Sequence, residues 1–292
     1  MTPFIALCLL ITYAVWGTTY LAIRFALADL PPFLMMGSRF LAAALLLAPI
    51  VMLRRPGRVS LRQLRNCALI GAFLLVGGMG LTAVAEQTIS SGATTVMIAS
   101  MPLFSTLWTL LAGGRPSAYE IAAIALGSVG IAMLFRGAEF QASTAGVLAL
   151  TTAIASWSFG SQLSKRIDMP KGLTAFVLEM AFGGVMLVVL SALTGEPWPR
   201  QIGQHAALAW GYQVIFGSAV AFTAYMALVQ RVSTVMATSY VYVNPPIALL
   251  MGAWLGGEQV APQTLSATTI ILAAVVVLTA GATRAARRTA TV

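Results

Sequence analysis

The sequence consists of long apolar stretches separated by short segments that hold most of its charged residues. Only 9% of the 292 residues are charged, whereas 59% are hydrophobic. A soluble domain carries about 25% charged residues, so this chain has too little polar material to cover a surface that faces water. It is therefore predicted to be a membrane protein. Each stretch is expected to form a helix, because lipid offers no partner for unpaired backbone groups.

Each apolar stretch is long enough to cross a bilayer. The hydrocarbon core is about 30 Å thick, which takes roughly 20 helical residues to span. The segments between stretches are rich in proline and glycine, as in Pro31-Pro32 and Glu196-Pro197-Trp198-Pro199. The ten predicted spans are residues 4–23, 33–53, 66–85, 90–111, 118–135, 144–163, 173–193, 207–229, 235–255 and 263–282.

The basic residues predict the orientation of these spans. With the N-terminus in the cytoplasm, 13 of the 17 lysines and arginines fall in segments on the cytoplasmic side, and Arg39 falls within a span. The outer segments hold only Arg24, Arg136 and Arg200. Because basic residues accumulate on the cytoplasmic side of membrane proteins, both termini are predicted to be cytoplasmic. The net charge of +9 then reflects orientation, and no nucleic-acid partner is expected.

An internal repeat divides the chain into two related halves, residues 1–140 and 141–292. The matches are Trp16-Gly17-Thr18-Thr19 with Trp157-Ser158-Phe159-Gly160 at an offset of 141, and Pro102 with Pro245 and Gly113-Gly114 with Gly256-Gly257 at an offset of 143. Each half holds five spans, an odd number, so the second half must enter the membrane from the opposite side. The predicted fold class is an all-α membrane protein of ten transmembrane helices, built as two five-helix repeats of inverted topology. Such repeats are typical of secondary transporters, although a duplication can also simply build a stable bundle.

Both halves resemble EamA repeats, which define the drug/metabolite transporter superfamily. The residues that carry the resemblance are Trp16-Gly17-Thr18-Thr19, Ser156-Trp157 with Leu163-Ser164-Lys165-Arg166, and the run from Val243 to Glu258. The first half departs from the pattern, because Arg115 stands where such repeats often have glutamate. Within this superfamily, the chain looks similar to bacterial aromatic amino-acid exporters of the YddG type. This resemblance implies an exporter of amino acids and related metabolites in the inner membrane. It also implies a central cavity lined by spans 1, 3, 4, 6, 8 and 9, with spans 5 and 10 peripheral.

Several residues within the spans are candidates for contact with a substrate. Trp16 and Trp157 occupy matching places and offer flat surfaces, unless they anchor the interface. Tyr240 and Asn244 are four residues apart and share a helix face. The Asn244 amide needs a partner at this depth, either a substrate or another helix. The candidate substrate-binding residues are Tyr13, Trp16, Gly78, Met101, Trp157, Tyr240 and Asn244.

Prolines and charged residues within the spans are candidates for conformational roles. Pro102, Pro245 and Pro246 lie near the middle of spans 4 and 9, and each removes a helical hydrogen bond, so they are candidate hinges or fixed kinks. Arg39 is expected to meet Glu86 at the outer side, and Glu179 is expected to meet Lys165 or Arg231 at the inner side. These pairs are candidate gates that alternate between the two sides, with static ion pairs as the alternative.

The predicted function is secondary transport by alternating access. The spans hold no series of acidic residues and histidines, and the single histidine, His205, falls in an external loop, so facilitated transport is expected. A proton-coupled drug or metabolite exporter of the same fold is the alternative. An intramembrane enzyme is a remote one, because it would need paired catalytic groups at matched depth. No catalytic residue, cofactor or metal is expected. The expected partners are a small-molecule substrate and the lipid bilayer, and the chain is expected to act as a monomer.

Overall fold

The computed structural model describes residues 2–53, 58–115, 117–137, 143–229, 231–232, 234–237 and 239–289. The predicted boundary between residues 140 and 141 lies outside these ranges. The first half contains α1 (Pro3–Ala26), α2 (Pro32–Leu53), α3 (Leu61–Gly71), η1 (Ala72–Gly80), α4 (Leu81–Glu86), α5 (Ser91–Ile98), α6 (Met101–Leu111) and α7 (Ala118–Phe135). The second half contains α9 (Thr144–Ser164), α10 (Leu173–Leu193), α11 (Gln204–Tyr212), η2 (Gln213–Val220), α12 (Ala221–Val229), α13 (Thr234–Ala237), α14 (Tyr240–Leu255) and α15 (Pro262–Thr289).

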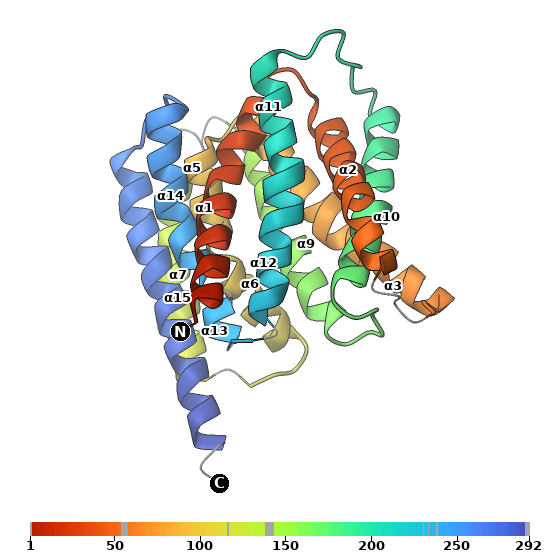
Figure 1. Cartoon of the computed structure of the whole chain (residues 1–292). Coiled ribbons are helices and arrows are strands. Elements are labelled where there is room, and N and C mark those ends of the chain that lie inside the picture. The colour runs from red at the N-terminus through yellow and green to blue at the C-terminus, as the bar shows by residue number, and fades with distance from the viewer. Residues whose placement is uncertain are drawn as a thin grey trace.

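These helices form a bundle of ten helical units, five from each half (Figure 1). The third unit of each half is one continuous helix, α3–η1–α4 or α11–η2–α12, whereas the fourth is broken into α5 and α6 or α13 and α14. In the described part of the chain, eight helices are long and apolar enough to cross a membrane, and α14 is a shorter apolar helix. The predicted all-α fold of ten helices is confirmed.

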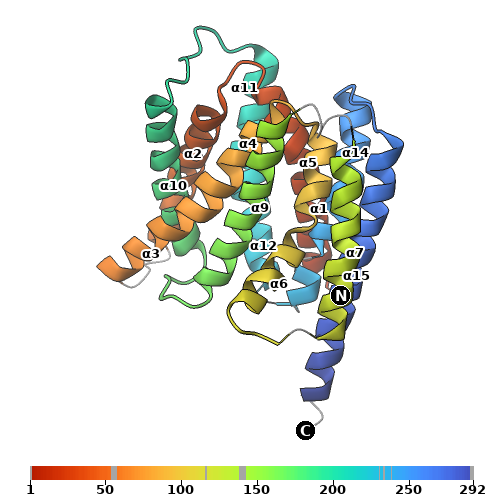
Figure 2. The same cartoon turned by 180° about the vertical axis from the view of Figure 1, so that it is seen from behind.

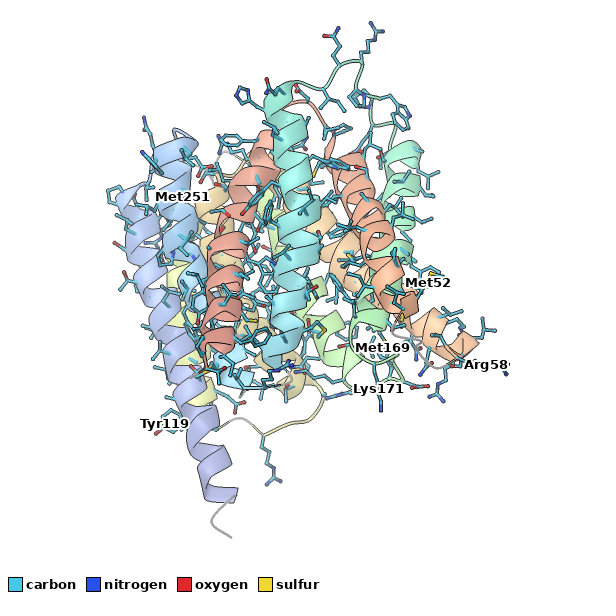
Figure 3. The ribbon with its side chains drawn as sticks, viewed as in Figure 1. Met52, Arg58, Tyr119, Met169, Lys171 and Met251 are labelled. Atoms are coloured by element: carbon cyan, nitrogen blue, oxygen red, sulfur yellow. The ribbon has the colours of Figure 1, made fainter. Side chains whose placement is uncertain are left out.

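The two halves have inverted topology. The helix α1 begins at the end of the bundle marked N and runs away from it, whereas α9 runs toward that same end (Figure 1). Figure 3 places Arg58, Met169 and Lys171 at this end, which we call the terminal face. The opposite end, which we call the far face, holds the turns 27–31, 194–203 and 256–261. The predicted inverted repeat is confirmed, and the cytoplasmic position of the termini stays a prediction.

The outer surface of the bundle is apolar. Leu45, Leu53 and Trp254 expose 74%, 83% and 74% of their surface. Exposed side chains of this kind are expected where helices face lipid, because lipid chains are as apolar as the protein core. The two cysteines, Cys8 and Cys67, are buried and free, which agrees with their small apolar character.

The predicted spans differ from the helices mainly at their ends. The third span was expected from residue 66, but α3 begins at Leu61. The Ser60 side chain accepts a hydrogen bond from the Gln63 backbone N–H, and the Gln63 side chain accepts one from the Ser60 N–H. This capping box starts a helix in a polar, basic segment at the terminal face, where hydropathy alone gives no signal.

Candidate functional site

A cavity of about 700 Å³ lies in the centre of the bundle and is lined by residues of both halves. No lining residue comes from α7 or α15, which pack against each other at the edge of the bundle (Figure 2). This agrees with the peripheral place that the family resemblance implies for spans 5 and 10. The helices α2 and α10 also contribute to the lining, and the resemblance did not imply them. Their lining residues are Arg39, Phe40, Phe176 and Glu179.

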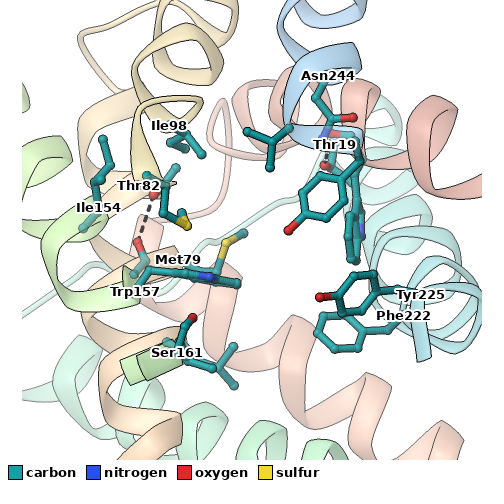
Figure 4. A pocket seen from close by; sticks show the side chains of 18 of the residues that line it. Thr19, Met79, Thr82, Ile98, Ile154, Trp157, Ser161, Phe222, Tyr225 and Asn244 are labelled. Atoms are coloured by element: carbon teal, nitrogen blue, oxygen red, sulfur yellow. Dashed lines mark hydrogen bonds between the residues drawn. The ribbon is translucent and has the colours of Figure 1, made fainter. Parts of the chain in front are cut away.

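Four aromatic side chains form one wall of the cavity. The Trp16 ring centroid lies 5.6 Å from that of Phe222, 5.3 Å from that of Tyr225 and 4.7 Å from that of Tyr240. We call Trp16, Phe222, Tyr225 and Tyr240 the aromatic cluster. Figure 4 shows Phe222 and Tyr225 across the cavity from Trp157 and Met79. Edge-on and tilted contacts of this kind hold the rings in fixed positions and present flat apolar surface to the cavity.

Trp157 on the opposite wall depends on a glycine of η1. A Cβ atom on Gly78 would lie 2.6 Å from Trp157 Cε3, so only glycine admits the indole at its present position. The segment η1 is a π-helix, in which each backbone hydrogen bond joins residues five positions apart, compared with four in an α-helix. The Phe73 carbonyl of η1 accepts a hydrogen bond of 2.8 Å from Ser156 Oγ, beside Trp157. The sequence predicts neither the π-helix nor this contact.

Trp16 has a corresponding contact with the second π-helix, η2. Its Nε1 donates a hydrogen bond of 3.1 Å to the Gly217 carbonyl. The two π-helices occupy the same unit of their respective halves, and each holds one of the two tryptophans that match in the repeat. The repeat therefore builds two facing walls of one cavity from equivalent parts.

Arg39 enters the cavity from α2 and is held by η2. Its Nε donates to Ser218 Oγ at 3.0 Å, and its Nη1 donates to Gln213 Oε1 at 2.6 Å. The guanidinium also lies 5.2 Å from the Phe40 ring centroid. Arg39 is 4% exposed and Gln213 is fully buried. These two polar partners were not found from the sequence, although Gln213 and Ser218 stand out as polar residues within an apolar stretch.

Span 9 presents one polar face to the cavity. Tyr240 and Asn244 both line it, as their spacing indicates. The Asn244 Oδ1 atom is buried without a hydrogen-bond partner. Tyr242 points away, because its hydroxyl donates to the Val275 carbonyl at 3.2 Å and lies 2.6 Å from Thr279 Oγ1.

Some of the other candidate residues line the cavity, and others do not. Met101, Pro102 and Pro245 line the cavity, whereas Pro246 does not. Tyr13 also lies outside the lining, and its hydroxyl is 2.5 Å from Ser239 Oγ.

The prolines sit differently in the two broken units. In span 4 the helix is interrupted at Ala99–Ser100, just before Pro102. In span 9, Pro245 and Pro246 lie within the continuous helix α14 and leave the carbonyls four residues earlier without a helical donor.

The ionisable candidates do not form the expected pairs in this conformation. Both carboxyl oxygens of Glu86 are buried without a hydrogen-bond partner, so Glu86 forms no hydrogen bond with Arg39. Glu179 and Lys165 both line the cavity on its terminal-face side. Among the described residues, the ion pair that forms within 4.0 Å joins neither of them. It joins Arg24 and Glu258 at the far face, with an Nη1–Oε1 distance of 2.9 Å.

Glu258 holds three helices together at the far face. Its Oε1 accepts hydrogen bonds from the Ser91 backbone N–H at 2.9 Å and from Ser91 Oγ at 2.8 Å, and its Oε2 accepts one from the Gly92 N–H at 3.1 Å. A carboxylate is favoured there because the first N–H groups of α5 are unpaired and carry partial positive charge. We call Glu258, Arg24, Ser91 and Gly92 the far-face clamp. Glu258 is the last residue of the run from Val243 that carries the EamA resemblance, and the far-face clamp is its structural role.

Two further carboxylates tie the far face together. Glu196 accepts hydrogen bonds of 2.9 Å from the backbone N–H groups of Phe33 and Leu34 at the start of α2. Asp29 accepts one of 2.8 Å from the Gly203 N–H. On the terminal-face side, by contrast, the cavity extends to the polar side chains of Ser161, Gln162 and Lys165. Among the described residues, the terminal face is also joined, since the side chains of Gln63 and Asn66 donate hydrogen bonds to Asp168.

Comparison with known proteins places this architecture among transporters. The model of the EamA-like transporter family matches residues 3–136 and 144–280, which is most of both halves. The uncharacterised inner membrane transporter YedA of Escherichia coli strain K12 is 40% identical over 270 residues, covering 92% of this chain and 88% of that protein.

More distant relatives match a similar length. The uncharacterised transporter YoaV of Bacillus subtilis strain 168 is 25% identical, covering 82% of this chain and 84% of that protein. The protein PagO of Salmonella typhimurium is 24% identical over 89% of this chain and 88% of its own length. A crystal structure of another protein superposes with a TM-score of 0.64 at 20% identity, covering 97% of this chain and 99% of that one, which shows a shared fold.

Proposed function

Because the chain belongs to the EamA-like transporter family and is a multi-pass membrane transporter, we propose that it exports amino acids across the bacterial inner membrane. The solutes proposed are amino acids with aromatic or apolar side chains and related small metabolites. The observation that carries this proposal is the cavity of about 700 Å³ between the two inverted halves, with aromatic walls and polar side chains that include Arg39 and Asn244. A cavity of this size holds a single small solute.

The cavity offers complementary surfaces to such a solute. Its flat side chain fits between Trp157 and the aromatic cluster, which face each other across the cavity (Figure 4). The unpaired Asn244 Oδ1 accepts a hydrogen bond from the solute's ammonium group. Pairing this oxygen on binding removes the cost of a buried acceptor without a partner. Gly78 and Met101 shape the walls around the bound solute.

The conformation described is the one that opens toward the cytoplasm. The far-face clamp closes one end, while Ser161, Gln162 and Lys165 line the cavity toward the terminal face, which we assign to the cytoplasm from the distribution of basic residues. Export then requires the two halves, residues 1–140 and 141–292, to rock so that the clamp breaks and the terminal face closes. The break before Pro102 and the prolines of α14 are the proposed hinges. One chain completes the cavity, so a monomer suffices.

Counterflow in liposomes tests the proposal. Purified protein is reconstituted with trapped unlabelled phenylalanine, and uptake of labelled phenylalanine is followed without a pH gradient. A facilitated exporter is expected to accumulate label transiently and to do so equally when a pH gradient is added. Absence of counterflow with any amino acid tested would contradict the proposed function.

A proton-coupled mechanism is the second candidate, and Glu179 favours it. Glu179 lines the cavity from α10 and forms no ion pair with a described residue. Its carboxyl group is therefore able to bind a proton on one side of the membrane and release it on the other in each transport cycle. If coupling occurs, a pH gradient is expected to raise the final accumulation severalfold. Glu179→Gln should abolish that increase while counterflow persists. Equal accumulation with and without the gradient rejects this mechanism.

A further inference from the structure

Arg39 is a fixed cation at the cavity wall. Two of its three guanidinium nitrogens are held from η2, by Ser218 Oγ at 3.0 Å and by Gln213 Oε1 at 2.6 Å. Both acceptors are neutral and buried, so they orient the guanidinium without neutralising its charge. The planar guanidinium is thereby held in one orientation, and its remaining nitrogen, Nη2, is the group available to a ligand.

No carboxylate compensates the Arg39 charge by contact. Among the described residues, the ion pair within 4.0 Å is that of Arg24 with Glu258, at the far face. Glu86 is the acidic residue expected beside Arg39, but both of its oxygens lack a hydrogen-bond partner. A buried cation that no carboxylate contacts is costly, and such a charge is a candidate site for a ligand that supplies the missing partner.

The Nη2 atom lies against Gly217 and next to aromatic surface. A Cβ atom on Gly217 would lie 3.2 Å from Nη2, so a larger side chain at this position would press on the guanidinium, which lines the cavity. The Gly217 carbonyl accepts the hydrogen bond from Trp16 Nε1, which places the indole directly beside the guanidinium site. Trp16 in turn packs on Tyr240 of the aromatic cluster. A cationic anchor and a flat apolar surface therefore lie side by side.

We infer that Arg39 determines specificity by binding a carboxylate of the transported solute while the aromatic cluster holds its apolar body. This inference rests on the proposed function and adds a chemical requirement to it: the solute must carry an anionic group. A carboxylate adds the attraction between opposite charges to its hydrogen bond from the guanidinium, and a neutral amide lacks that attraction. A carboxylate solute is therefore expected to bind about tenfold more tightly than its amide.

Three probes with the same aromatic body test the inference on the wild-type protein. They are 3-phenylpropanoate, 3-phenylpropanamide and 3-phenylpropylammonium, which differ only in the charge of the polar group. Binding is measured as the rise in Tm of the purified protein with ligand concentration, because a ligand of the native state raises its apparent stability. The expected order of affinity is carboxylate, then amide, then ammonium, with about a tenfold first step.

Variants then assign the preference to Arg39. Arg39→Gln is expected to bind carboxylate and amide equally. Arg39→Lys should keep part of the preference, because the charge remains but the oriented fork is lost. Gln213→Leu frees Nη1 and is expected to weaken carboxylate binding selectively. Arg62→Gln is the matched control, since Arg62 is exposed outside the cavity, and it should leave the preference intact.

The outcomes separate this inference from the proposed function. Equal binding of carboxylate and amide to the wild type, preference for the ammonium, or no Tm shift with any probe would overturn the inference. Retention of the carboxylate preference in Arg39→Gln would also overturn it. The wild-type comparison remains decisive if a variant misfolds. If amino-acid counterflow occurs but carboxylate and amide inhibit it equally, only the role of Arg39 fails; if no counterflow occurs, the proposed function itself fails.

Discussion

At the scale of single residues, the cavity depends on positions where the side chain must be small. Gly78 and Gly217 each lie where a tryptophan reaches a π-helix, one on each wall. The sequence predicts the candidate residue types, because tryptophan, asparagine and arginine are conspicuous in apolar spans. It does not predict their partners. The contact of Arg39 with Gln213 and Ser218 joins α2 to η2 across more than 170 positions, and only the packing of the helices determines it.

Gly78→Ala is expected to displace Trp157 from the cavity wall. The added Cβ would lie 2.6 Å from Trp157 Cε3, and overpacking of this kind costs about 1–3 kcal/mol. Counterflow should fall strongly while the protein still reaches the membrane, and Tm should drop. Gly211→Ala is the matched control, because nothing lies within 4 Å of its Cβ position, and it should retain transport. Equal transport by the two variants would contradict the role of this contact.

At the scale of helices, the two ends of the bundle differ in the side chains that join their helices. The far-face clamp joins α1, α5 and the turn after α14 through one carboxylate. Gly252 makes room for it, since a Cβ there would lie against the Glu258 carboxylate. The position that matches Glu258 in the first half is Arg115, so the same clamp cannot form from that half. Hydropathy and the repeat predict where helices lie, but not which loop carboxylate reaches which helix start.

Glu258→Gln is expected to loosen the far face. It removes the charge and replaces one acceptor oxygen by an NH₂ donor, so a backbone N–H of Ser91 or Gly92 loses its acceptor, at about 1–3 kcal/mol. Arg24→Gln should cost less than about 1 kcal/mol, since the Arg24 side chain is 42% exposed and the α5 bonds remain. The measurement is Tm in detergent for both variants. A larger loss in Arg24→Gln would show that the ion pair, and not the helix start, holds the clamp.

At the scale of the whole molecule, the fold and a central cavity lined by spans 1, 3, 4, 6, 8 and 9 were expected, and the details of the cavity lining were not. Ten spans and their inversion follow from hydropathy and from a repeat with an odd number of spans, because backbone N–H and C=O groups in lipid must be paired within helices. The π-helices and the contribution of α2 and α10 to the cavity lining depend on how the helices pack, and local sequence patterns do not reveal that packing. The orientation from basic residues and the division at residues 140 and 141 stay predictions. The cavity between the halves nevertheless lies where inverted repeats place a transport site.

The central claim is that this one cavity opens to each side of the membrane in turn. Met79 lines the cavity, and Met79→Cys provides a single reactive thiol once Cys8 and Cys67, both buried, are replaced by alanine. Oriented proteoliposomes are treated with a membrane-impermeant thiol reagent from one side or the other, with and without phenylalanine. Alternating access predicts labelling of the same cysteine from both sides, with the far-side rate raised by substrate. Labelling from one side only, under every condition in which counterflow is seen, would contradict it.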